Sequence, residues 1–465
     1  MPETRFLGVT LLPEYIQTES VDGVLDRLTQ AGVSAVATSP YVMEDTTPDT
    51  GTREPPADSD AGKVRLLDRP LWGKRELFVR TEPSYAADLS LYKGLRYQPS
   101  PPGELTRREG KIIQQFIRGA QSRHIKVYFQ VQAAIPPGYR VQFGGPQKDD
   151  QALLPDGRIP PRRLAKNGSL ASPHIVRYGE ALIRDLMRAY PEIDGIRVDW
   201  PEYPPYFLDD VFLDFSPHAE AAAKRLGFDF ARMRDATGAL YKHLHGGLTD
   251  RDLELWTDPD GGRYTLLSAL SARPALVSWL RFKSALVDEM LAAYRAASAG
   301  KEFVPNAFPP PFTLASGMDF ARLARRVDGF SVKLYTMHWP MMLDFYGSVL
   351  RKANPNVSTK LLARALVRWM DIADDDGLPR LEDYTYPPPD VPHPVGLRAQ
   401  ERKILDARRQ AGQTPVYALA HGFGPVEDFR RRLEVAWMAS DRRIWVNRYA
   451  YLSDEKMDVI RDVCS

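Results

Sequence analysis

The sequence predicts a closed (β/α)8 barrel with long loops after strands two, three and four. Two observations favour this fold class. Near-continuous apolar runs of strand length alternate with segments of helical spacing along the whole chain, which is typical of βαβ units and a parallel sheet. Eight such runs can be counted in the 465 residues, and eight is the number that closes this barrel. The long loops are of the kind that usually carries function.

The first βαβ unit shows how each element is recognised. Residues 6–12 form an apolar run that predicts a strand buried on both faces, and residues 21–31 have helical spacing. The second strand covers residues 33–37. The later strands are predicted at residues 125–132, 194–199, 303–306, 329–335, 415–419 and 444–447. The later helices are predicted at 111–123, 172–190, 217–227, 228–245, 272–297, 320–326, 339–350, 358–370, 400–410, 426–439 and 453–463.

A long insertion follows the second strand and covers about residues 44–109. It is rich in proline and charge, yet it also contains several aromatic residues. Because disordered linkers are poor in aromatic residues, we expect an ordered loop insertion over one face of the barrel. The expected organisation is a single domain that spans residues 1–465.

The composition is that of a soluble globular protein, with 43% apolar and 26% charged residues. The net charge of +2 gives no reason to expect a nucleic acid or membrane partner. The only cysteine, Cys464, excludes a disulfide scaffold. We see neither a leader sequence nor an apolar stretch that could span a bilayer, so we expect a cytoplasmic protein. The oligomeric state cannot be derived from the sequence.

The fourth strand leads into a cluster of carboxylates and aromatic rings. Successive side chains of a strand point to opposite faces, so Arg197 and Asp199 share the face that is turned away from the covering helices. Charged residues on such a hidden face are costly unless it lines a site. Prolines then hold Glu202 beside the carboxyl end of the strand, which is where barrel enzymes carry out their chemistry.

Asp199 and Glu202 form a candidate acid–base pair. The cation of Arg197 favours the ionised form of Asp199, and the aromatic surroundings of Glu202 favour its protonated form. Glycoside cleavage requires such a division between two carboxyl groups. We interpret Glu202 as the acid that protonates the leaving oxygen and Asp199 as nucleophile, base or stabiliser. The alternatives are a structural ion pair between Arg197 and Asp199, and a Glu202 that is only a solvated loop residue.

Further polar and aromatic residues end or follow the other strands, so we expect them at the same rim. Amides and carboxylates bond sugar hydroxyls, and aromatic rings stack on sugar rings. The predicted substrate-binding residues are Glu14, Tyr41, Gln130, Gln132, Arg197, Trp200, Tyr203, Asn306, Lys333, Tyr335, His338, Trp339, His421, Asn447 and Tyr449. Alternatively, Glu14 lies on the surface, His338 and Trp339 begin a helix, and His421 is a buried structural histidine.

The sequence predicts neither a metal ion nor an organic cofactor. The eight histidines are scattered along the chain, and His243 and His245 would point to different faces of a helix. The acidic runs lack the spacing of a calcium loop. The glycine pairs do not form a nucleotide fingerprint, and there is no nucleophilic serine elbow.

The segment Asp194-Gly195-Ile196-Arg197-Val198-Asp199-Trp200-Pro201-Glu202-Tyr203-Pro204 resembles the fourth-strand signature of the chitinase-like glycoside hydrolases, Asp-Gly-x-Asp-x-Asp-Trp-Glu-Tyr-Pro. It departs twice, because Arg197 replaces an aspartate and Pro201 is inserted before Glu202. The first change removes a partner for substrate-assisted attack by an acetamido group. Arg197-x-Asp199 is similar to the Arg-x-Asp of the α-amylase class, but Asn306 and the His421 segment stand where that class has further carboxylates.

The chain as a whole resembles the uncharacterised bacterial glycosyl-hydrolase-like (β/α)8 barrels. They share a helix that opens with Ser-Pro, the segment Asp-Gly-Ile-x-x-Asp-Trp/Tyr-x-x-Tyr-Pro, and a tyrosine-rich eighth strand, here residues 445–451. The resemblance is specific around residues 172–206. It implies a barrel that acts on a carbohydrate.

These observations lead to the hypothesis of a glycoside hydrolase that cleaves an oligosaccharide or a glycoside with a carboxylate pair. One alternative is a barrel isomerase or lyase that acts on a sugar or sugar acid, with Lys333 or Tyr335 as base. Another is a carbohydrate-binding barrel without catalysis.

Overall fold

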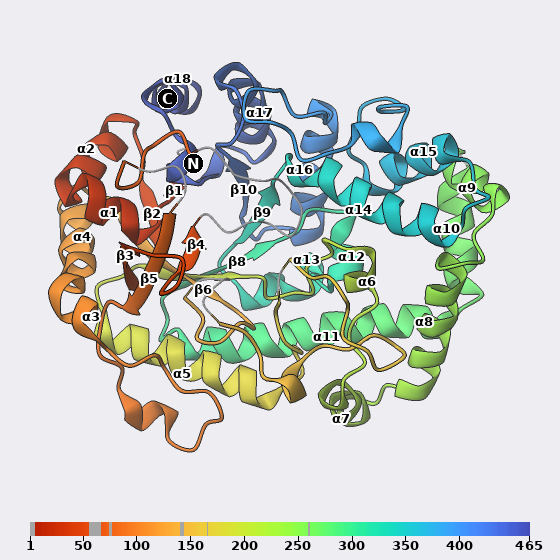
Figure 1. Ribbon diagram of the computed structural model, residues 1–465, viewed down its shortest axis with the longest axis horizontal. Coiled ribbons are helices and arrows are strands. Elements are labelled where there is room, and N and C mark those ends of the chain that lie inside the picture. The colour runs from red at the N-terminus through yellow and green to blue at the C-terminus, as the bar shows by residue number, and fades with distance from the viewer. Residues whose placement is uncertain (1–4, 55–66, 74–76, 140–143, 165, 259–260) are drawn as a thin grey trace.

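The computed structural model describes residues 5–54, 67–73, 77–139, 144–164, 166–258 and 261–465. A closed barrel of parallel strands forms its centre (Figure 1), with the order β1-β11-β10-β9-β8-β7-β6-β2. The strands are β1 (Phe6–Thr10), β2 (Ala35–Thr38), β6 (Lys126–Gln132), β7 (Gly195–Asp199), β8 (Glu302–Ala307), β9 (Phe330–Leu334), β10 (Val416–His421) and β11 (Arg443–Asn447). The predicted (β/α)8 barrel is confirmed, and every predicted strand overlaps a barrel strand.

After each barrel strand, the chain passes through a helix that packs on the outer side of the barrel. These helices are α2 (Val21–Gln30), α4 (Lys111–Ser122), α5 (Pro173–Ala189), α11 (Pro274–Ala297), α13 (Phe320–Leu323), α16 (Leu397–Ala411), α17 (Val426–Ala439) and α18 (Asp454–Cys464). Helix α5 begins as its sequence predicts, because the Ser172 hydroxyl accepts a hydrogen bond from the Ile175 amide at 3.3 Å and Pro173 is the first helical residue.

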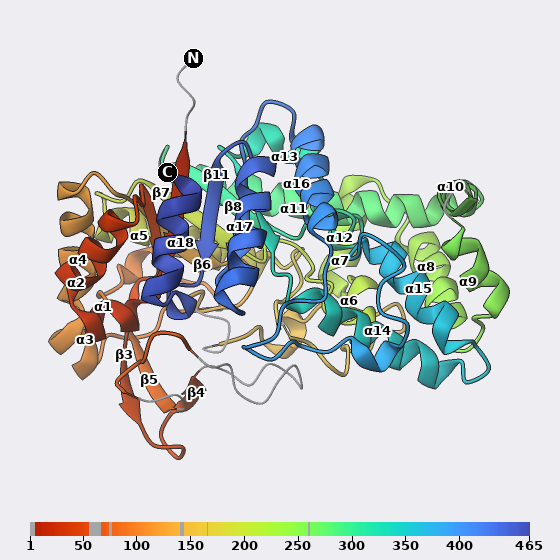
Figure 2. The same cartoon turned by 90° about the horizontal axis from the view of Figure 1, so that it is seen from above.

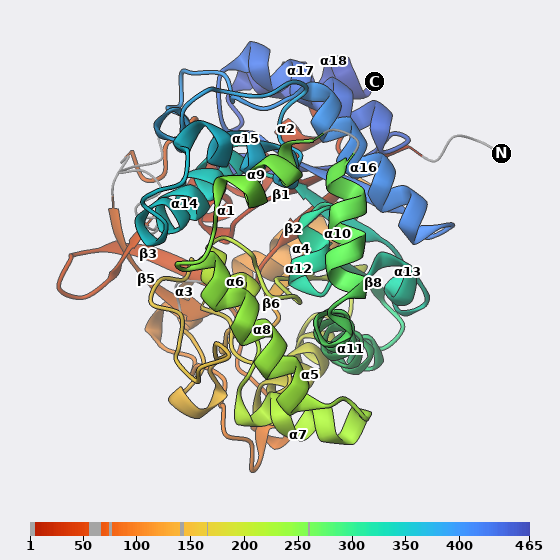
Figure 3. The same ribbon diagram turned by 90° about the vertical axis from the view of Figure 1, so that its right-hand side faces the viewer.

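The loops between strands and covering helices carry further elements. The α-helices are α1 (Pro13–Glu19), α3 (Glu104–Glu109), α6 (Leu208–Val211), α7 (Pro217–Leu226), α8 (Phe230–Leu244), α9 (Asp250–Thr257), α10 (Gly261–Ser271), α12 (Phe312–Ser316), α14 (His338–Ala353) and α15 (Thr359–Met370). The short 3-10 turns are η1 (Leu89–Tyr92), η2 (Lys148–Asp150), η3 (Ala324–Arg326), η4 (Leu381–Asp383) and η5 (Tyr449–Tyr451). Helices α8, α9, α10 and α15 lie together on one side of the barrel (Figures 1 and 3).

The insertion after β2 contains a small antiparallel sheet. Its strands are β3 (Tyr41–Thr46), β4 (Thr52–Glu54) and β5 (Leu77–Pro83), in the order β3-β5-β4. Figure 2 shows this sheet on the side toward which β11 points, which is the carboxyl end of the barrel. Residues 55–66 and 74–76 of the predicted insertion lie outside the described residues. No helix in the described part of the chain has the length and apolarity needed to cross a membrane.

The inside of the barrel is filled by large side chains that pack against small ones. A buried cluster separate from the main core consists of Ala35, Ala37, Tyr128, Leu419 and Trp445. Trp445 of β11 lies beside Gly8 of β1, its partner in the strand register. A Cβ atom at Gly8 would lie only 2.3 Å from the Trp445 ring. The barrel centre is therefore packed with side chains, as in other barrels of this kind.

We predict that Gly8→Ala lowers the free energy of unfolding, measured by urea denaturation, by about 1–3 kcal/mol because the added methyl group overpacks the barrel. Gly238→Ala in α8 is the matched control, since its Cβ would lie 3.6 Å from the nearest atom. There the loss of glycine from a helix should leave stability equal or raise it by about 0.5–1 kcal/mol. A Gly8→Ala variant as stable as the wild type would contradict the predicted packing.

Candidate active site

Asp199 lies at the carboxyl end of β7 and faces the barrel interior. Ile196 and Val198 on the other face are fully buried, as the alternation predicts. The Asp199 Oδ1 atom lies 2.7 Å from Nζ of Lys333 on β9. Asp199 keeps 13% of its side chain exposed, whereas Lys333 keeps 1%. The carboxylate is therefore the accessible half of a nearly buried ion pair.

The ion pair determines the protonation state of Asp199. Burial, the largest single cause, would raise the pKa of this carboxyl group, but the ammonium of Lys333 and weaker neighbours together hold the pKa below its usual value. A hydrogen bond from Asn306 and the charge of Arg197 act in the same direction. Arg197 is the cation expected from the sequence, and the structure adds Lys333 as a closer partner.

Arg197 lies deeper in the barrel and bonds other groups. Its Nη2 atom donates hydrogen bonds to Asn306 Oδ1 at 2.7 Å and to Ser331 Oγ at 2.6 Å. Its guanidinium carbon lies 4.1 Å from the centre of the Trp445 ring, a cation–π contact. Burial lowers the pKa of Arg197 to about 10. The Asp199 carboxylate therefore pairs with Lys333, and Arg197 contacts Asn306, Ser331 and Trp445 below that pair.

Glu202 follows three residues after Asp199 and is fully buried. Its Oε1 accepts a hydrogen bond from the Phe308 amide at 2.7 Å, and its Oε2 accepts one from the Ser316 hydroxyl. Burial raises the pKa of Glu202 to about 7, although Lys333 and both hydrogen bonds oppose the rise. A solvated Glu202, one of the alternatives from the sequence, is therefore excluded.

Aromatic rings continue from Trp200 across the ends of the next strands. Ring centroids lie 6.1 Å apart between Trp200 and Tyr206, and 5.5 Å apart between Tyr206 and His338. The row continues through Tyr335, 5.4 Å from His338, to His421, a further 5.1 Å away. This row comes from three strand ends and their loops. Aromatic faces in such a row suit the apolar faces of sugar rings.

Two features of this rim are typical of a binding site. Several buried polar atoms in the described part of the chain have no hydrogen-bond partner, and two of them, the indole nitrogen of Trp200 and Oε1 of Gln132, lie at this rim. Buried polar atoms without a partner are rare and require an explanation such as a water or ligand. Trp200 also has a positive φ of 51°, a strained conformation for a bulky residue that concentrates at functional sites.

Some predicted binding residues make hydrogen bonds at the ends of the barrel strands, near Asp199 and Glu202. Asn306 Nδ2 donates to Gln130 Oε1 at 3.3 Å, which joins two predicted residues on β8 and β6. Asn447 Oδ1 accepts a hydrogen bond from the Thr10 hydroxyl at 2.5 Å. Glu14 is buried, not on the surface, and accepts a hydrogen bond from the Tyr41 hydroxyl at 2.9 Å.

Three other predicted binding residues make contacts of a different kind. The Tyr203 hydroxyl donates to Asp214 at 3.1 Å, and the Tyr449 hydroxyl donates to Glu19 at 2.6 Å. Trp339 is buried in α14 beneath the ammonium of Lys403, 5.0 Å from its ring. These contacts are those of packed structural residues, and a substrate-binding role for the three stays a prediction that the contacts do not favour.

Sequence reasoning missed the two groups that hold the Glu202 carboxylate. Phe308 directly follows β8, and Ser316 is the last residue of the short helix α12. One contact uses a backbone amide, which carries no residue signature. The other uses a serine whose neighbours give no sign of a distant carboxylate partner.

Two solved structures that are similar in fold to this eight-stranded parallel barrel are a glycoside hydrolase domain and a β-galactosidase. The glycoside hydrolase domain of PgaB (BpsB) from Bordetella bronchiseptica is 14% identical over 99% of both chains, with a TM-score of 0.53. A β-galactosidase from the psychrophilic Marinomonas ef1 is 13% identical over 99% of this chain and 59% of that chain, with a TM-score of 0.50. No family model and no curated protein matches the sequence. At such identities, the likeness establishes the fold.

We predict that Glu202→Gln removes a pH-dependent part of the stability. The carboxyl group has a pKa of about 7 when folded, above its ordinary value of 4.5. Its stabilising contribution is thus complete below pH 4.5 and is lost as the pH rises through 7. Between pH 5 and pH 8 the wild type should lose roughly 2 kcal/mol more than the variant, measured by urea denaturation. Equal losses in both proteins would show that Glu202 does not titrate as described.

Proposed function

We propose that this chain hydrolyses a glycosidic bond in an oligosaccharide or glycoside, with Asp199 and Glu202 as the reacting carboxyl groups. The proposal rests on one observation above the others. Two neighbouring carboxyl groups have pKa values shifted in opposite directions, below the usual range for Asp199 and to about 7 for Glu202. Pairs of this kind mark the acid and the base of a reaction. The glycoside hydrolases of similar fold support the class of reaction.

In the proposed reaction, Glu202 transfers its proton to the glycosidic oxygen as the bond from that oxygen to the anomeric carbon breaks. The ionised Asp199 stabilises the positive charge that develops on the sugar, as nucleophile, base or electrostatic partner. A water molecule supplies the hydroxyl group to the anomeric carbon, and its remaining proton restores the acid. A pKa near 7 suits an acid that works at neutral pH.

The Glu202 carboxyl group must become accessible for this role. Its Oε2 atom faces the Ser316 hydroxyl, so a substrate oxygen has to replace that contact. Catalytic hydrogen bonds often form only when substrate binds. The row of rings from Trp200 to His421 supports a carbohydrate substrate, because aromatic side chains commonly line the sites that bind such ligands. A cytoplasmic site of action stays a prediction from the sequence.

The alternative of a lyase or isomerase with Lys333 as base has less support. The Lys333 nitrogen lies 2.7 Å from the Asp199 carboxylate. It would have to leave this ion pair to take a proton from a substrate. The second alternative, a carbohydrate-binding barrel without catalysis, would bind a sugar but would not cleave it.

We predict that the effect of Glu202→Gln depends on the leaving group. A sugar leaving group needs protonation, so kcat/KM on an unactivated glycoside should fall by about 10²–10⁴-fold. A dinitrophenyl leaving group departs without a proton, so turnover of that glycoside should be nearly unchanged. Asp199→Asn should lower kcat/KM for both substrates because it removes the stabilising negative charge. A Glu202→Gln variant that loses both activities equally would refute the acid role, and absence of turnover on an aryl-glycoside panel would favour the binding barrel.

The Ser316 hydroxyl lowers the pKa of Glu202 through its hydrogen bond to the carboxyl group. Ser316→Ala should raise that pKa further, so the alkaline limb of the kcat/KM profile should move to higher pH. Thr313→Ala on the same short helix serves as the control and should leave the limb in place. A limb that does not move in Ser316→Ala would mean that a different group titrates.

A further inference from the structure

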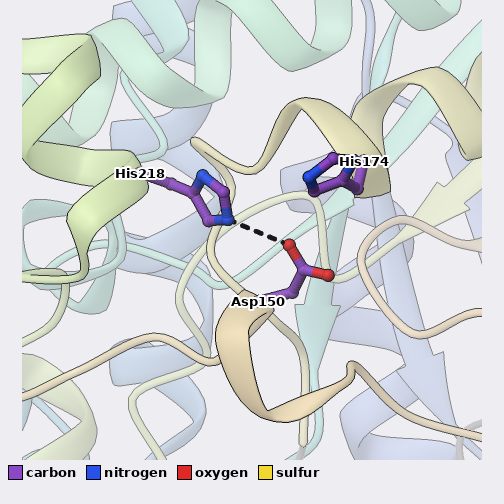
Figure 4. A group of neighbouring side chains, drawn as sticks. All are labelled: Asp150, His174 and His218. Atoms are coloured by element: carbon purple, nitrogen blue, oxygen red, sulfur yellow. Dashed lines mark ion pairs between the residues drawn. The ribbon is translucent and has the colours of Figure 1, made fainter. Parts of the chain in front are cut away.

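A second cluster of ionisable side chains lies outside the proposed active site, where α5 and α7 begin (Figure 4). Asp150 ends the short turn η2 and is buried, while His174 and His218 are partly exposed. One carboxylate oxygen and one nitrogen from each ring lie within 4.8 Å of one another. The His218 Nε2 atom is 3.0 Å from Asp150 Oδ1.

The two histidines occupy equivalent places because their helices begin with the same tripeptide. Ser172-Pro173-His174 begins α5, and Ser216-Pro217-His218 begins α7. In each, the serine hydroxyl caps the helix and proline is the first helical residue, so the imidazole is on the second. No metal site is expected from histidines that are scattered along the chain, but the fold brings these two to one carboxylate.

Neighbouring groups fix the orientation of this carboxylate. Asp150 Oδ2 accepts hydrogen bonds from the Tyr97 hydroxyl at 2.7 Å and from Arg96 Nη1 at 3.0 Å. Oδ1 accepts a hydrogen bond from the Ser172 hydroxyl at 2.5 Å and faces His218. Carboxylates that ligate metals are held by similar outer hydrogen bonds, which orient the ligating oxygen.

We propose that Asp150, His174 and His218 bind a divalent transition-metal ion, with Zn²⁺ as the best fit. Two imidazoles and one carboxylate form a ligand set that zinc accepts, with a fourth position for water. Zinc bonds of about 2.0–2.1 Å place tetrahedral ligand atoms about 3.3 Å apart. The 3.0 Å separation of His218 from Asp150 is close to this value, and His174 has to turn inward from the wider spacing.

The bound ion would have a structural role. The Ser216 amide that precedes α7 donates to Asp214 at 2.9 Å, and the Tyr203 hydroxyl donates to the same residue at 3.1 Å. Tyr203 follows Glu202 directly in the chain. An ion at the start of α7 would thus hold in place the segment that carries Glu202. It would also stabilise the folded protein, because a ligand that binds only the folded state shifts the folding equilibrium toward that state.

Titration calorimetry with ZnCl₂ on the full chain, first dialysed against EDTA, tests the proposal without any assay of activity. We expect one zinc ion per chain and a higher thermal unfolding midpoint in its presence. His174→Ala and His218→Ala should each weaken zinc binding by at least about tenfold and abolish the gain in midpoint. Both rings are partly exposed, so these variants should fold, whereas Asp150→Asn would also disturb the contacts of Tyr97, Arg96 and Ser172.

His243→Ala is the matched control, because His243 is an exposed histidine on α8 that pairs with Asp252. It should bind zinc as the wild type does. The proposal is overturned if the wild type binds no zinc, or if folded His174→Ala and His218→Ala proteins bind it with wild-type affinity. A loss of affinity confined to His243→Ala would place the bound ion elsewhere and overturn it equally.

Discussion

The ion pair between Asp199 and Lys333 is the interaction on which the rest of the candidate site depends. Lys333 has 1% of its side chain exposed, and its ammonium lies 5.3 Å and 5.1 Å from the ring centres of Trp200 and Phe308. Without the carboxylate, a buried charge among rings would be strongly destabilising. Because β8 separates β7 from β9 in the barrel, the pair also connects two strands that are not neighbours. The ion pair therefore both fixes the charges of the site and links two strands of the barrel.

A single cation acts on two carboxyl groups that end in different protonation states because only one of them contacts it directly. Lys333 lowers the pKa of both Asp199 and Glu202. At Asp199, which forms the direct contact, this attraction exceeds the cost of burial when the contributions of Asn306 and Arg197 are added. At Glu202 the cost of burial is larger than the attraction and the two hydrogen bonds together. The division of roles thus arises from position relative to one ammonium group, and not from any difference between aspartate and glutamate as residue types.

The sequence predicted the barrel because each buried parallel strand is an apolar run in its own right, and the alternation of β7 placed Asp199 on the inner face. It also predicted the raised pKa of Glu202 from the neighbouring rings. It could not predict the Lys333 partner or the Ser316 contact, because both depend on strand order and loop packing. Helices α9 and α10 and the sheet of β3, β4 and β5 were not predicted either, since their short segments gain stability from tertiary packing more than from their own pattern.

The packing of Trp445 against Gly8, with Arg197 above the indole, has a consequence for molecular traffic. These side chains block the barrel interior below Asp199, so a ligand can reach this carboxylate only from the carboxyl end of the barrel. If the proposed cleavage takes place there, substrate enters and products leave on the same side of the molecule. The products therefore have to depart before the next substrate binds.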